Sequence, residues 1–368
     1  MGRWRRRLLL FAVLLGAYGA TLALSTGGRD ERTDDEAHVL LVAESIVSDG
    51  DVDLRDEYRA RAWRAFTDGP VEPAGTLTNG RLHEPYGIAL GALVAPAYAL
   101  GGALGAELLL AALLAVAFVV AAGVARRLVP DPWPTGLTLA VGLSPPALLA
   151  AGTVAPATPA ALLLIAAVAL ALRVRDRPRL APTAGCAALV ALLPWLAIGL
   201  LLPALVVALA LARWLRRRSR GLVGFTALEV VLTSGVFFVA VNDRLFGGAV
   251  PDAARAAGAP PVGVWDLEQA GELLRAPVLA LVLVAAGLLV RSRRERLAVA
   301  LPEQLDVEIA VTLLLLVVAA CVLQPVAALP VAAALAAWSA RRVPRTTRGL
   351  VALTAVGSVW LLAAGPLT

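Results

Sequence analysis

Long apolar runs alternate with short Arg-rich breaks along most of the chain. Eleven of these runs carry few or no charges, and their lengths approach the ~20 residues with which a helix crosses a hydrocarbon core about 30 Å thick. They cover 8–24, 104–125, 136–153, 157–173, 181–194, 196–213, 222–241, 276–290, 308–323, 326–340 and 349–366. The pattern predicts an all-α polytopic membrane protein with about eleven transmembrane helices.

The polar segments divide this predicted integral membrane domain, which we expect to extend over 1–368 as one unit. Its expected parts are a first transmembrane helix in 1–24, an outer loop with interfacial helices and an acidic motif in 25–103, helices two to seven in 104–241, a second outer loop in 242–275, and helices eight to eleven in 276–366. The N-terminal basic residues before 8–24 are also compatible with a cleaved signal peptide. The length of that run favours an uncleaved helix.

The segment Gly87–Gly102 is apolar but shorter than the other runs, and Pro96 interrupts it. We expect an interfacial or re-entrant helix here rather than a full span. The distribution of Arg agrees, because this layout places 23 of the 33 basic residues on the side of the N-terminus. Basic residues collect in cytoplasmic loops. The prediction is therefore a plasma membrane protein with a cytoplasmic N-terminus and extracytoplasmic residues 25–103.

Composition supports this class. Hydrophobic residues make up 59% of the 368 residues, against roughly 45–50% in soluble domains. The net charge of +6 is explained by the membrane topology, so no nucleic-acid partner is expected.

The outer loop begins with an acidic cluster at Thr33, Asp34, Asp35 and Glu36, followed by His38. Thr followed by Glu three positions later is typical of a capping box at a helix start. A purely structural role also explains these acids, because the helix dipole stabilises negative charge at the N-terminus of a helix. A carboxylate with His on the same helix face also suits a general base or a divalent-metal site. The chain contains two His, and His83 lies in the same loop.

A second acidic motif, Asp49-Gly50-Asp51-Val52-Asp53, resembles the start of a calcium-binding loop. Leu54 stands at the position of the loop's Gly, and Ala60 stands at the position of its bidentate acid. We therefore expect this motif to form a turn that ends the preceding helix.

Polar residues in or beside predicted spans are further candidates. Glu229 lies in the middle of the predicted span 222–241. A carboxyl group inside a membrane helix is energetically costly, so such a residue suggests a functional site. A protonated Glu that hydrogen-bonds to a neighbouring helix explains Glu229 equally well. Arg244 follows the same span and is our first candidate for a phosphate ligand, because a guanidinium binds phosphate oxygens in pairs. Its competitors are Arg81, Arg55 and Arg255.

The order of motifs resembles the polyprenyl-phosphate-dependent GT-C glycosyltransferase superfamily, near its bacterial protein-mannosyltransferase-like and lipopolysaccharide-glycosyltransferase-like members. The resemblance rests on the Asp-Glu-x-His helix at 35–38, Asp49-Gly50-Asp51-Val52-Asp53-Leu54, Asn79-Gly80-Arg81-Leu82-His83-Glu84-Pro85-Tyr86-Gly87, Ala95-Pro96-Ala97-Tyr98-Ala99-Leu100-Gly101-Gly102 and Asn242-Asp243-Arg244-Leu245-Phe246-Gly247-Gly248. It is strongest over 30–175.

The resemblance implies a GT-C-like fold and hexosyl or pentosyl transfer from a polyprenyl-phosphate-linked donor to a cell-envelope glycan, lipid or protein. It maps the catalytic carboxylates onto Asp35 and Glu36. The expected substrate-binding residues are Asp34, His38, His83, Arg81, Arg244 and Glu229. No cofactor is certain, and a divalent cation (Mg²⁺ or Mn²⁺) on Asp35 and Glu36 stays open.

Two positions depart from the family pattern. Ala157 stands where these proteins carry an acid, and Ala197 stands near the expected His and basic residue after a Leu-Pro-Trp segment. These losses favour an alternative, a catalytically inactive GT-C-like protein that binds a lipid-linked glycan or a partner enzyme. A transporter or flippase is the second alternative, although we find neither the inverted repeat nor the paired broken helices typical of that class.

Overall fold

The structure is a computed structural model that describes residues 2–25, 32–75, 77–217, 221–251, 276–294, 301–321 and 324–364. Its α-helices are α1 (Arg3–Ser25), α2 (Asp34–Ser48), α3 (Arg55–Ala60), α4 (Ala89–Ala125), α5 (Trp133–Gly142), α6 (Pro145–Ala151), α7 (Ala157–Asp176), α8 (Leu180–Leu196), α9 (Leu201–Arg217), α10 (Gly221–Phe246), α13 (Ala280–Arg294), α14 (Leu301–Cys321), α15 (Pro325–Ala340) and α16 (Pro344–Ala364). The short elements are η2 (Ala62–Ala65), η3 (Ile198–Leu200), η4 (Pro277–Leu279), β1 (Leu77–Thr78) and β2 (Arg81–Leu82).

Each of the eleven predicted spans coincides with a helix or with the bent pair α5–α6. Among the described residues, five helices are long and apolar enough to cross a membrane, and six if that pair, bent by 60°, counts as one span. Four further apolar helices in the same residues are shorter, among them α8 and α15. The fold class predicted from the sequence, a polytopic α-helical membrane protein, is confirmed. The number of membrane crossings stays a prediction.

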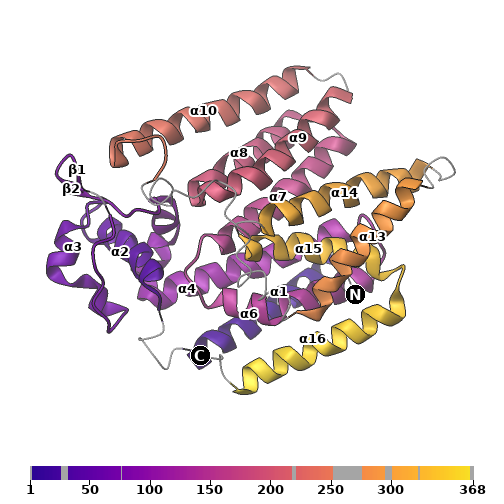
Figure 1. The fold of residues 1–368 in the computed structure, drawn as a ribbon, viewed down its shortest axis with the longest axis horizontal. Helices are drawn as coiled ribbons and strands as arrows, with labels where there is room; N and C mark the ends of the chain where they lie inside the picture. Colours follow the sequence, from indigo (N-terminus) through magenta and orange to yellow (C-terminus); the bar gives the residue numbers. More distant parts are fainter. Residues whose placement is uncertain are drawn as a thin grey trace.

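Helix α15 forms the centre of the helix bundle and packs against α4, α5, α7, α13 and α14 (Figure 1). All of its residues from Ala327 to Ala340 are buried. Eight of its sixteen residues are Ala, and small side chains let neighbouring backbones approach closely without a hydrophobic driving force between helices. The peripheral helices α10 and α16 lie along opposite edges of the bundle (Figure 1).

The helix α4 is broken at Gly101 and Gly102, whose backbone angles are not helical. Gly102 has φ +60°, a region that Gly enters without a Cβ clash. A side chain at Gly105 would collide with the Ala97 carbonyl oxygen, although residues eight apart on a straight helix are separated by about 12 Å. The chain therefore turns back at Gly101–Gly102. The prediction of an interfacial or re-entrant helix at Gly87–Gly102 stays a prediction.

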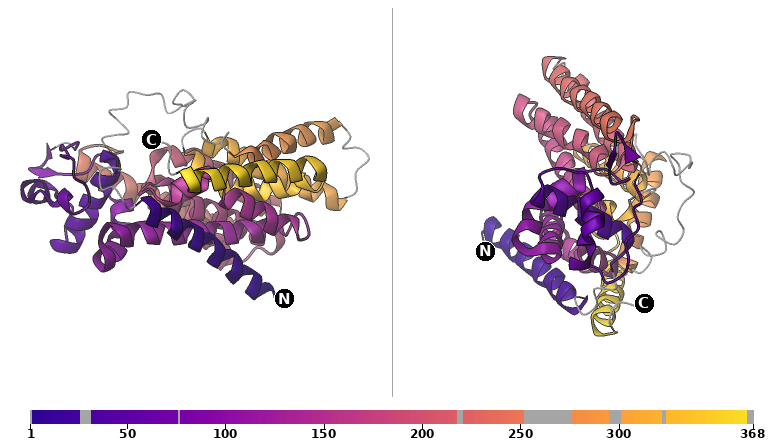
Figure 2. Two further views of the ribbon diagram at one scale, coloured as in Figure 1. Left: turned by 90° about the horizontal axis from the view of Figure 1, so that it is seen from below. Right: turned by 90° about the vertical axis from the view of Figure 1, so that its left-hand side faces the viewer.

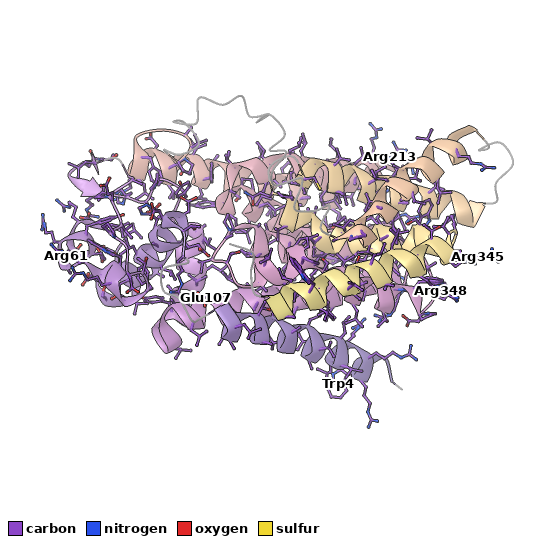
Figure 3. The ribbon with its side chains drawn as sticks, turned by 60° about the horizontal axis from the view of Figure 1, so that its bottom comes forward. Trp4, Arg61, Glu107, Arg213, Arg345 and Arg348 are labelled. Atoms are coloured by element: carbon purple, nitrogen blue, oxygen red, sulfur yellow. The ribbon has the colours of Figure 1, made fainter. Side chains whose placement is uncertain are left out.

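Arg clusters that we predicted to share one side of the membrane lie at one end of the bundle. Asp131 joins the first two clusters, because Arg6 contacts its carboxylate at 3.1 Å and Arg126 at 3.2 Å. Arg127 pairs with Asp176 of the next cluster at 2.8 Å. In Figure 3, Arg213, Arg345, Arg348 and Trp4 lie towards this end, opposite Arg61. Which side of a bilayer this end faces stays a prediction.

The opposite end carries a small unit, which we call the first-loop unit, made of residues 32–98 (Figure 2). Its core contains Leu40, Leu41, Leu54, Phe66 and Val94 and is a cluster distinct from that of the bundle. The unit adds a short antiparallel hairpin, β1–β2, to the predicted all-α architecture. Asn79 and Gly80 form its turn with φ +54° and +75°, as two-residue hairpin turns of this hand require.

Candidate functional site

The acidic cluster forms the N-terminus of α2. The predicted capping box is present, because the Thr33 side chain accepts from the Glu36 backbone and Glu36 accepts from the Thr33 backbone at 3.0 Å. The second oxygen of Glu36 accepts a 2.7 Å hydrogen bond from the backbone N–H of Val154, between α6 and α7. Glu36 is buried, and it ties the start of α2 to the bundle.

Asp35 lies one position before Glu36 and is exposed, as is Asp34. The Tyr86 hydroxyl lies near Asp35, and the interaction with this carboxylate together with burial raises the pKa of Tyr86 to about 12. Tyr86 stays protonated across the physiological range and can donate to this carboxylate. Of the two predicted catalytic carboxylates, Asp35 is the solvent-accessible one.

A buried polar group lies beside Asp35 and consists of His38, Tyr58 and Glu84. The Nδ1 atom of His38 is 2.9 Å from the Tyr58 hydroxyl and 3.3 Å from the Glu84 Oε2 atom. Burial, reinforced by the charge of Asp35, raises the pKa of Glu84 to about 9. Burial also lowers the pKa of His38 from 6.5, although the charges of Asp35 and Asp34 oppose this.

These shifts make the His38–Glu84 contact an interaction between neutral groups rather than an ion pair at pH 7. Burial raises the pKa of Tyr58 as well, so its hydroxyl keeps its proton. The Tyr58 hydroxyl and a protonated Glu84 can each donate to the His38 Nδ1 atom. This neutral trio leaves Asp35 as the accessible acid of the group.

The end of α10 contacts the first-loop unit at His83. The His83 ring lies against Phe246 with ring centroids 6.2 Å apart, and its Nδ1 atom is 2.8 Å from the Val52 carbonyl oxygen. A Cβ added at Gly87 would lie 3.5 Å from Pro251, so a second contact follows further along. The two segments that we expected to lie on one side, 25–103 and the start of 242–275, therefore meet.

The Arg candidates for a phosphate differ in their present partners. Arg55 binds Asp53 at 2.7 Å, and Asp53 also accepts from the Leu82 backbone, so Arg55 stabilises the hairpin. Arg81 on β2 and Arg244 near the end of α10 are exposed. The fourth candidate, Arg255, lies outside the described residues.

Glu229 is exposed on α10, a helix whose apolar segment is 11% buried. It lies thirteen residues before Asn242, or about 20 Å along the helix axis. The structure thus does not bring Glu229 together with Asp35. Its assignment as a substrate-binding residue stays a prediction.

Within the described part of the chain, no third ligating side chain joins the predicted metal pair, Asp35 and Glu36. Both oxygens of Glu36 accept hydrogen bonds from Thr33 and Val154, and neither residue belongs to a group of three ligating side chains within the described part of the chain. We therefore assign no metal to this pair. Such a group does form at Asp49, Asp56 and Glu57.

Sequence reasoning missed Glu84, Tyr86 and Tyr58 as residues beside the candidate site. Glu84 and Tyr86 flank Pro85 directly after His83, so a buried acid and a Tyr beside a selected His were an available signal. Tyr58 carried no such signal, because its contact with His38 spans 20 positions and depends on how α3 folds back.

Helices of this arrangement, with a first loop folded over one end of the bundle, define a GT-C-like membrane fold. A crystal structure of ArnT from Cupriavidus metallidurans bound to undecaprenyl phosphate is similar to this chain, with a TM-score of 0.59 and 17% sequence identity. The likeness covers 97% of this chain and 63% of ArnT, so the chain spans less than two thirds of that protein's length. No family model and no curated protein sequence matches the chain.

Proposed function

We propose that the chain is an integral membrane glycosyltransferase that transfers a sugar from a polyprenyl-phosphate donor to an extracytoplasmic acceptor. The observation that carries the proposal is Asp35, an accessible carboxylate beside Tyr86 at the end of the bundle where α10 meets the first loop. The similarity in fold to ArnT, which was crystallised with undecaprenyl phosphate, supports a lipid-phosphate donor.

In this proposal Asp35 is the general base. The acceptor hydroxyl attacks the anomeric carbon, a new C–O bond forms, and the proton passes to the Asp35 carboxylate. The bond between the sugar and the phosphate breaks, and the lipid phosphate leaves with both electrons. Arg244 and Arg81 are the candidates that neutralise its charge. Protonated Glu84 adds no base at pH 7, and His38 is buried, so Asp35 is the base that is open to an acceptor.

The test is turnover of radiolabelled polyprenyl-phosphate hexoses and pentoses by purified protein in lipid nanodiscs. Asp35→Asn keeps the shape of the side chain and removes its basicity, so we expect turnover to fall by roughly 10²-fold or more. Asp68→Asn, an exposed acid further along the same loop, is the matched control and should leave turnover unchanged. Unchanged turnover in a correctly folded Asp35→Asn variant removes Asp35 from the reaction.

A specific observation also favours the non-catalytic alternative. Ala157 is buried at the start of α7, three residues after Val154, whose backbone binds Glu36. The acid that related proteins carry at this position would lie close to the α2 start, and this chain lacks it. Under this alternative the protein binds undecaprenyl phosphate and turns over none of the donors. Turnover of a bound donor excludes this alternative and supports the enzyme.

A further inference from the structure

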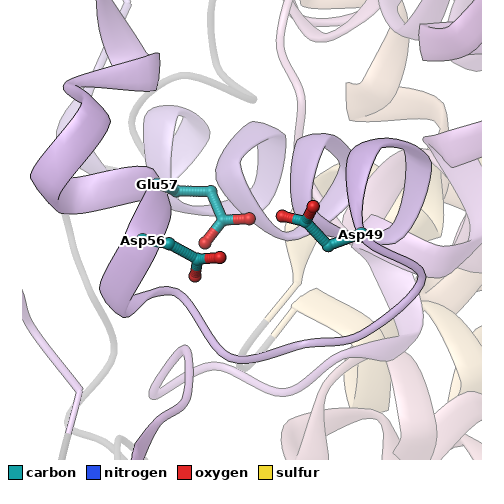
Figure 4. A group of neighbouring side chains, drawn as sticks. All are labelled: Asp49, Asp56 and Glu57. Carbon is teal, nitrogen blue, oxygen red and sulfur yellow. The ribbon is translucent and has the colours of Figure 1, made fainter.

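The end of α2 and the start of α3 bring three carboxylates together outside the Asp35 group. Asp49 is the C-cap residue of α2, and Asp56 and Glu57 lie in the first turn of α3. One ligand oxygen from each lies within 4.8 Å of the others. Figure 4 shows the side chains of Asp49 and Glu57 pointing towards one another, with Asp56 beside them.

Glu57 distinguishes this group from an ordinary acidic surface. Its side chain is 4% exposed, and neither carboxylate oxygen is hydrogen-bonded among the described residues, although Asp56 and Ser45 are polar neighbours. Buried polar atoms without partners are rare in native structures and call for an explanation such as an ion. Asp49 and Asp56 are exposed, and Asp49 accepts a hydrogen bond from Ser48 at 3.2 Å. The group thus has one buried acid and two acids open to solvent.

The group is not the calcium loop that the sequence suggested at Asp49–Asp53. The middle acids of that motif have other partners, because Asp51 accepts from Ser45 and from the backbone of Asp53. Asp53 binds Arg55 and the Leu82 backbone. Asp49 is the motif member that remains, and α3 supplies the other two acids from outside it.

We infer that Asp49, Asp56 and Glu57 form a binding site for a hard divalent cation, with Ca²⁺ as the preferred ion. The donor set contains oxygen alone, which suits Ca²⁺ or Mg²⁺ rather than softer metals. Ca²⁺ takes six to eight oxygen ligands in flexible geometry. Bidentate carboxylates and water on the exposed side of Asp49 and Asp56 supply the rest.

The ion would fix α3 against α2. Tyr58 follows Glu57 directly and donates towards His38, so the two neighbouring side chains of α3 connect the cation site with the Asp35 group. The ion in this site is structural, because its ligands do not contact Asp35. Its removal should loosen Tyr58 and leave the bundle intact.

The test uses the full chain in detergent, stripped with EDTA and titrated with CaCl₂ by calorimetry. We expect one bound Ca²⁺ and a melting temperature that rises by several degrees at saturating Ca²⁺, because an ion that binds the folded state stabilises it. Asp49→Asn is exposed and should weaken binding by about tenfold or more. The control Glu72→Gln, an exposed acid of the same loop, should bind like wild type.

Glu57→Gln separates an ion site from a merely buried acid. This variant should lose the Ca²⁺-dependent rise in melting temperature and be at least as stable as wild type in EDTA, because it removes an unpartnered buried carboxylate. An unchanged melting temperature of wild type in saturating Ca²⁺ overturns the inference. Wild-type Ca²⁺ affinity in the Asp49→Asn variant also overturns the inference. A melting temperature that rises with Mg²⁺ and not with Ca²⁺ contradicts the preference for Ca²⁺.

Discussion

The helix bundle and the first-loop unit stabilise their interiors in opposite ways. Buried polar side chains described in the bundle interior carry mostly hydroxyl groups that donate to backbone carbonyls, as Thr138, Ser339 and Ser358 do. The first-loop unit instead buries titratable groups, each with its own environment. They are Glu36, His38, Asp53, Glu57, His83 and Glu84.

The difference shows where chemistry can reside in this chain. A bundle that packs Ala against Ala gains little from polar groups and cannot hydrate them. The first-loop unit has a small apolar core of its own, so acids can be buried there a short distance from solvent. Neighbouring groups then shift the pKa values of these acids. Glu107 on α4 marks the boundary, since Arg32 of the loop pairs with it at 2.8 Å.

The boundary ion pair gives the largest expected effect. Arg32 donates twice to Glu107 and once to the Phe66 carbonyl, and the two side chains are 18% and 5% exposed. Arg32→Gln leaves Glu107 buried without its charge partner, which costs about 3–5 kcal/mol in comparable sites. Thermal unfolding in detergent should show a large drop in melting temperature. A drop no larger than that of a surface substitution contradicts the boundary role.

Overpacking of the bundle comes next. Ala333 on α15 is completely buried, and a larger side chain there has no free space. Ala333→Leu should destabilise the chain by about 1–3 kcal/mol. The same melting measurement checks it, with Ala363→Leu on the exposed side of α16 as control. Equal melting temperatures for these two variants would show that the bundle core is loosely packed.

Glu84 should make stability depend on pH. The folded chain keeps this proton up to about pH 9, whereas an ordinary carboxyl loses it near 4.5. Folding therefore takes up a proton within this window, and stability falls as the pH rises through it. The lowered pKa of His38 makes stability rise with pH at lower pH, so the comparison is made between pH 7 and 9. Over that interval the Glu84→Gln variant should lose less stability than wild type. Parallel curves for the two proteins contradict a raised pKa.

The smallest effect belongs to the Arg127–Asp176 pair at the far end of the bundle. Its side chains are 35% and 59% exposed. Exposed ion pairs are worth about 0–1 kcal/mol, so Arg127→Gln should barely change the melting temperature. Together with Arg32→Gln this variant compares two pairs of equal length in different surroundings. A large effect here removes the contrast between the two ends.

The predictability of the two regions follows the same division. Hydrophobic length alone located the bundle helices, and a four-residue signature predicted the α2 cap, because both are local properties of the chain. The Glu36–Val154 bond joins residues 118 positions apart, and no spacing rule indicates it. The same holds for Tyr58 with His38. Long-range contacts of this kind give Asp35 its surroundings, so the sequence offers Asp35 as a candidate but does not predict its neighbours.

The position of α15 has a consequence for how the bundle is completed during synthesis. This helix is the innermost one, yet it follows α1 to α10 along the chain. The earlier helices enter the bilayer before their central partner has left the ribosome, since chains emerge from the N-terminal end. Helices α4, α5 and α7 can therefore reach their final packing only after α15 has been synthesised.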